Sequence, residues 1–187
     1  LISIIIAIYY SGEVVWRERE RKMHEIVDAT ALPNWAFVVP KTIGVILVLV
    51  STLAVGAVVA IVIQLARGYT DISIGEYIVW FLVPVGFNVA FLAVLAVFVQ
   101  ALSPNKYAGW GIMVVYLVVS IVMESVGFEH NLYDYGSAGD GPLSDMNGSG
   151  GFMVRGWWLR LYWTGFAIVL LVLAHLLWRR GTEQRLK

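Results

Sequence analysis

Long, uninterrupted apolar runs are the feature that most constrains this chain. Four of them lie at about 43–65, 77–102, 107–126 and 157–178. A bilayer core of about 30 Å requires roughly 20 apolar residues in a helix. The runs are continuously apolar and lack the alternation that is typical of membrane β-strands. They therefore predict an all-α polytopic membrane protein.

Composition leads to the same class. The 187-residue chain is 59% hydrophobic and 14% charged, with a mean hydropathy of +0.77. Soluble domains average roughly 45–50% apolar and about 25% charged residues. A fifth apolar run, 1–16, is too short to span alone and is predicted to be the second half of a truncated helix. The chain thus forms one domain, 1–187, with five spans. It contains no cysteine, which excludes disulfides and thiolate chemistry.

Lys and Arg residues predict the orientation, because they are enriched in cytoplasmic connections. The segment 17–41, the short turn with Lys106 and the C-terminal tail are basic. The connections at the other end carry Arg67 and Arg155 among several acidic residues. We therefore expect a multi-pass protein of the inner (plasma) membrane with 17–41 and the C-terminus in the cytoplasm. The Gly/Asp-rich segment 127–156 is predicted to be an external loop that forms a cap.

The charged segment after the first run is the exception in this apolar chain. No Pro or Gly interrupts Glu13 to Thr30, so we expect the helix to continue out of the membrane until Pro33 ends it. An apolar stripe follows helical spacing, and Glu18 and Lys22 have the i,i+4 spacing of an ion pair. Acidic residues nearly cancel the basic ones, which favours a protein partner. An amphipathic helix on lipid headgroups remains the alternative.

The stretch "GEVVWRERERKMHEIVDATALPNW", followed by Lys41, resembles the cytoplasmic loop of ABC type-2 transporter permeases. The ending "WWLRLYWTGFAIVLLVLAHLLWRRGTEQR" resembles the last span of a subgroup that is fused to a zinc aminopeptidase. The matching positions in the first stretch are Glu13, Glu18, Arg19, Glu25, Ile26, Asp28, Ala29, Pro33 and Lys41.

The resemblance implies a permease half with six spans, so this chain would be a fragment lacking the first span. In that family the cytoplasmic loop carries a coupling helix that docks on an ABC ATP-binding subunit. The expected partners are that subunit, a second permease half and the lipid bilayer, with no nucleic acid. ATP and Mg would be bound by the partner subunit, and this chain would need no cofactor. The alternative is a non-transporting membrane anchor for an adjacent peptidase domain.

Catalytic motifs do not occur in the sequence. No Gly-rich phosphate-binding motif is present, and His24-Glu25 lacks the second His of a zinc protease because Asp28 stands in its place. We therefore predict that the chain is not an enzyme by itself and has neither catalytic nor metal-ligating residues.

Few polar residues lie inside the spans. Asn88 is the deepest of them, just after Pro84 and Gly86, and is predicted to line a pathway or to bond across a helix interface. Gln100, near the cytoplasmic end of its span, is expected to reach water. Small residues at four-residue spacing, such as Gly56 and Ala60, are expected to allow close helix packing.

Overall fold

The structure is a computed structural model that describes residues 2–24, 26, 32–128, 130–139 and 151–178. Over these residues the chain is helical and contains no β-strand. In order, the helices are α1 (Ile2–Glu20), α3 (Trp35–Ala66), α4 (Ile74–Glu76), the π-helix η1 (Tyr77–Leu82), α5 (Val83–Leu102), α6 (Lys106–Ser125) and α7 (Phe152–Leu177).

The described residues contain 4 helices long and apolar enough to cross a membrane, which confirms the predicted class of all-helical membrane protein. They are Trp35–Ala66, Ile74–Leu102, Lys106–Ser125 and Phe152–Leu177. Large apolar side chains on their outer faces are exposed, for example Val55 at 63% and Leu176 at 67%. Such surfaces suit a lipid solvent. A fifth span formed by α1 stays a prediction.

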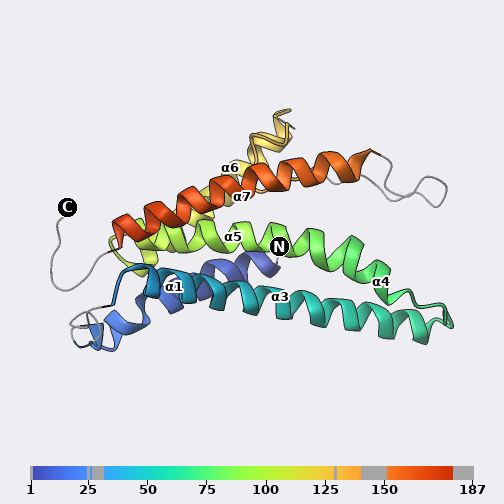
Figure 1. Cartoon of the computed structure of the whole chain (residues 1–187), viewed down its shortest axis with the longest axis horizontal. Coiled ribbons are helices and arrows are strands. Elements are labelled where there is room, and N and C mark those ends of the chain that lie inside the picture. Colours follow the sequence, from blue (N-terminus) through green and yellow to red (C-terminus); the bar gives the residue numbers. More distant parts are fainter. Residues whose placement is uncertain (1, 25, 27–31, 129, 140–150, 179–187) are drawn as a thin grey trace.

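Helix α5 lies at the centre of the bundle, with α1 and α3 on one side and α6 and α7 on the other (Figure 1). Helices α3, α5 and α7 run side by side, whereas α6 runs obliquely to them. One apolar cluster joins α1, α3 and α5 around Leu49 and Ala93, and a second joins α5 and α7 around Phe91 and Trp163. Close van der Waals packing of this kind holds membrane helices together, because lipid gives no hydrophobic drive for their association.

Helix α1 ends earlier than the sequence predicted. The Met23 N–H donates to the Glu18 carbonyl (3.0 Å) and the Lys22 N–H donates to the Arg19 carbonyl (3.1 Å). Lys22 has φ 55°, so these bonds form a Schellman turn with Lys22 in its left-handed position. A continuous helix from Glu13 to Thr30 is therefore wrong, because the turn closes α1 at Glu20.

Helix α3 begins at Trp35, before the predicted span start at 43, and includes Pro40. Pro40 removes the bond that its N–H would make to the Ala36 carbonyl, a loss confined to the start of the helix. In the next span, η1 ends at Leu82, so only Val83 separates it from Pro84. A π-helical turn absorbs the backbone disruption that the missing N–H of Pro84 causes. The weakening expected near Pro84 and Gly86 is thus present as a local change of helix type.

The predicted external loop, 127–156, is only partly described, and its described part folds back onto the bundle. The Trp163 Nε1–H of α7 donates to the Ser137 carbonyl (2.9 Å), and Gly136 lies against Phe91 of α5. Trp163 is about 16 Å along α7 from its first residue, at 1.5 Å per residue. Irregular backbone at such depth is tolerated where protein covers it, and Ala138 is only 2% exposed.

Candidate functional site

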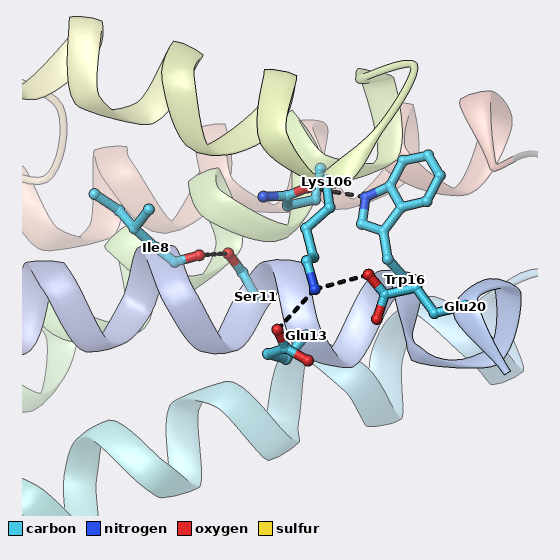
Figure 2. A network of polar contacts seen from close by, with 7 residues as sticks. Ile8, Ser11, Glu13, Trp16, Glu20 and Lys106 are labelled. Carbon is cyan, nitrogen blue, oxygen red and sulfur yellow. Dashed lines mark hydrogen bonds and ion pairs between the residues drawn. The ribbon is translucent and has the colours of Figure 1, made fainter.

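The strongest polar cluster lies where α1 meets the first turn of α6. Lys106 Nζ lies 2.8 Å from a Glu13 carboxylate oxygen and 2.7 Å from a Glu20 oxygen, as Figure 2 shows. The Lys106 side chain is 11% exposed, and the Trp110 ring lies 5.2 Å from its ammonium group. Glu13 and Glu20 lie about two turns apart on one face of α1 and together hold a single, largely covered cation from another helix. Water still reaches the Glu13 and Glu20 side chains, which are 33% and 46% exposed, so these ion pairs contribute less than fully buried ones would.

A second ion pair joins α1 to α3. Lys41 Nζ lies 2.8 Å from a Glu18 oxygen, and its side chain is 10% exposed. The same ammonium group lies 5.1 Å from the Trp178 ring, just after α7. Asn34 adds a contact between α3 and α7, because its Nδ2 donates to the His175 carbonyl (3.3 Å). One end of the bundle is thus tied across four helices.

Gln100 of α5 lies inside this end of the bundle. It is 0% exposed, and its Oε1 accepts a 2.9 Å hydrogen bond from the Trp16 indole N–H. The expectation that Gln100 reaches water is therefore wrong. Its amide fits because Gly12 and Gly109 face it: a Cβ on Gly109 would lie 2.5 Å from Gln100 Cδ. We call the set Glu13, Trp16, Glu18, Glu20, Lys41, Gln100 and Lys106 the polar junction.

A small cavity of about 30 Å³ borders the polar junction. Glu18, His24, Gln100 and Ser103 contribute polar groups to its wall. The Nε2 of Gln100 and the Nδ1 of His24 are buried without a hydrogen-bond partner in the described chain. Because one water needs roughly 10–15 Å³ of such space, the cavity is only a few times the size of one water molecule. Chemically, the junction fixes helices relative to one another; its residues include no nucleophile paired with a base.

The predicted interface residues take different positions. Glu13 and Glu18 point into the polar junction, and the Arg19 guanidinium lies 5.4 Å from the Trp16 ring. Ile26 is 74% exposed, and Pro33 is exposed just before α3. Glu25 and Asp28 lie outside the described residues. Binding of another protein by this segment stays a prediction, but the i,i+4 pair of Glu18 with Lys22 is wrong because Glu18 pairs with Lys41.

Asn88 is half-buried in α5, and its Oδ1 is buried without a hydrogen-bond partner in the described chain. The structure thus gives no interhelical bond to this oxygen. Gly56 also differs from expectation, because nothing lies within 4 Å of a Cβ built there. Gly12 and Gly109 provide the close helix contacts instead.

Potential metal-ligand groups are sparse. The described residues contain no group of three His, Asp or Glu side chains placed to hold a metal ion.

The sequence reasoning missed one buried and one half-buried residue toward the other end of the bundle. Arg160 of α7 is 4% exposed, with its guanidinium 5.7 Å from the Trp157 ring. Tyr135 lies within an aromatic group that includes Phe91, Trp163 and Phe166. A charged residue inside the predicted span 157–178 was a signal for Arg160, because ionisable groups in spans are costly unless they are buried in protein. Tyr135 had no comparable signal, since it lies in an irregular segment.

The fold and the polar junction define a polytopic helical membrane protein. The sequence profile of one protein family, described as the transmembrane region of lysyl-tRNA synthetase, matches residues 35–182. This match covers most of the chain, so the chain belongs to that family. No curated protein and no solved structure shows a significant match.

Family membership overturns the functional prediction. Assignment to the ABC type-2 permeases is wrong, because the matching family is a different one. Transport coupled to ATP hydrolysis and anchoring of a peptidase lose their basis with it. The match begins at Trp35, so the segment 13–33 that carried the resemblance lies outside it. In the structure, acidic residues of that segment serve contacts within the chain.

Proposed function

We propose that this chain is the membrane-spanning region that holds a lysyl-tRNA synthetase at the cytoplasmic surface of the plasma membrane. The match of residues 35–182 to the transmembrane region of that enzyme carries the proposal. In this role the chain supplies attachment and orientation, takes no cofactor, and leaves lysine activation and transfer to the synthetase. Its immediate partners are the lipid bilayer and the catalytic unit.

The distribution of basic residues supports the cytoplasmic side. Lys41 and Lys106 lie at the end of the bundle where α1 ends and α3 and α6 begin. Arg17, Arg21 and Lys22 are exposed at the same end. Because Lys and Arg concentrate on the cytoplasmic side of membrane proteins, this end would face the cytoplasm. The polar junction would give an attached enzyme a rigid base, since its contacts cross-link four helices.

Capture of the native protein from its own membranes tests the synthetase assignment. The captured material should attach radiolabelled lysine to tRNA and should not attach arginine. An unrelated membrane protein captured with the same tag should show neither activity. Captured protein that forms no lysyl-tRNA, although it is intact and membrane-embedded, would refute the assignment.

Single cysteines test the orientation, because the chain has no cysteine of its own. Met23 and Tyr69 are 51% and 56% exposed and lie at opposite ends of the bundle. In intact cells, a membrane-impermeant thiol reagent should label Tyr69→Cys and leave Met23→Cys unlabelled. The reverse labelling would contradict a cytoplasmic polar junction without affecting the lysine-charging result.

A further inference from the structure

The charge that the end of α1 presents on the protein surface differs from the net charge of its residues in the sequence. Residues 13–22 contain acidic Glu13, Glu18 and Glu20 among four basic residues. All three carboxylates pair with lysines from other helices: Glu13 and Glu20 with Lys106, and Glu18 with Lys41. Two lysines balance two of these three carboxylates, and the Glu20 side chain, at 46%, is the most exposed of the three. The acidic residues of α1 therefore offset its outward-facing bases less than the sequence suggests.

Three basic side chains remain on the outside. Arg17, Arg21 and Lys22 are exposed and make no ion pair or side-chain hydrogen bond within the described part of the chain. Lys22 occupies the left-handed position of the Schellman turn, which directs the chain sharply away from the axis of α1. We call these three residues the basic strip. It carries three positive charges on a helix end that looks nearly neutral in the sequence.

Two large apolar side chains follow the basic strip along the chain. Met23 is 51% exposed and Ile26 is 74% exposed. The strip also lies at the end of the bundle where the spans α3 and α6 begin. Exposed cations next to exposed apolar side chains, at the level where membrane spans begin, are typical of surfaces that lie on a bilayer. A nucleic acid would use the cations but would gain little from Ile26 and Met23, so the observations favour lipid.

We propose that the basic strip binds the headgroups of anionic phospholipids, with Met23 and Ile26 resting at the acyl-chain boundary. Each Lys or Arg near an anionic membrane surface increases the association about fivefold. Three such residues would strongly enrich anionic lipid around α1. The basic strip could bind anionic headgroups in either leaflet of the membrane. The proposed lipid binding therefore does not depend on the synthetase assignment or on the orientation of the chain.

The test reports which lipid lies next to the strip. The full chain with Met23→Cys carries a fluorophore and is reconstituted into nanodiscs that contain headgroup-spin-labelled phosphatidylserine or phosphatidylcholine. Quenching should be stronger with labelled phosphatidylserine, and 0.5 M salt should weaken the preference, because salt screens exposed charges. A fluorophore on Tyr69→Cys, at the other end, should show much less preference.

Charge-removing variants establish which residues are responsible. Arg17→Gln, Arg21→Gln and Lys22→Gln should each reduce the phosphatidylserine preference about fivefold, and the triple variant should abolish it. Arg67→Gln and Arg155→Gln, exposed cations at the other end, should leave it unchanged. Equal quenching by both lipids in the parent protein, or a preference that survives the triple substitution, would overturn the proposal. So would strip-dependent binding of labelled polyuridylate to discs without anionic lipid, which would indicate an RNA site.

Discussion

Replacing Gly12 with alanine tests the contact between α1 and α6 most directly. A Cβ at Gly12 would lie 2.9 Å from Trp110 Cε2 and 3.1 Å from Gln100 Nε2, and closer still to Trp110 Nε1. The indole ring cannot easily move, because it stacks on Tyr9 at 5.7 Å and meets Tyr107 edge-on at 5.5 Å. Alanine at this position must therefore push α1 away from α6 or distort the buried Gln100 amide.

The expected magnitude combines two opposing effects. Overpacking a close contact costs about 1–3 kcal/mol, whereas alanine in place of glycine within a helix gains about 0.5–1 kcal/mol. Gly12→Ala should therefore lower the free energy of unfolding by about 1 kcal/mol, within a range of roughly 0–2.5 kcal/mol. Gly56→Ala is the matched control, because nothing lies within 4 Å of its Cβ. That variant should be more stable by about 0.5–1 kcal/mol.

Unfolding in mixed micelles with increasing sodium dodecyl sulfate, followed by far-UV circular dichroism, measures both variants. The two substitutions add the same methyl group to a helix, so opposite signs would isolate the contact with Trp110. If Gly12→Ala stabilises the protein as Gly56→Ala does, α1 does not pack against α6 as the structure has it.

Three further predictions concern single side chains. Lys106→Met should lower the free energy of unfolding by about 2 kcal/mol. This is less than the cost of breaking a fully buried pair, because Glu13 can partly rehydrate. The control, Arg67→Met, should change the free energy of unfolding by less than about 0.5 kcal/mol. Equal effects in the same micelle titration would contradict a role for the ion pairs. Lys22→Gly should stabilise the protein by about 1 kcal/mol, because glycine adopts the left-handed φ without strain. Thermal unfolding at matched pH should then show a raised midpoint. A lowered midpoint would argue against the Schellman turn. Burial raises the pKa of Tyr135 above its usual value of 10, so its contribution to stability should be complete below about pH 10 and should fall as pH rises further. Tyr135→Phe should remove that part of the alkaline loss, and identical pH profiles for parent and variant would exclude it.

The sequence by itself determined the solvent and the secondary structure of this protein. The runs at 43–65, 77–102 and 157–178 each lie within one long helical segment or overlap it almost completely. Lipid cannot hydrogen-bond a free N–H or carbonyl group, so a continuously apolar run must satisfy its backbone within itself. That constraint is local, and a local pattern is enough to reveal it.

Tertiary structure decided what the polar residues do. Lys106 and Lys41 select their carboxylates from a distant helix, which leaves the bases of α1 less balanced by acids than they are in the sequence. Gln100 is buried because Gly12 and Gly109 come to face it. The resemblance to transporter permeases treated the charges of 13–33 as a surface for another protein, whereas three of the acidic ones are engaged within the bundle. Such pairing depends on which helix ends meet in space, and periodicity along one helix contains no information about that.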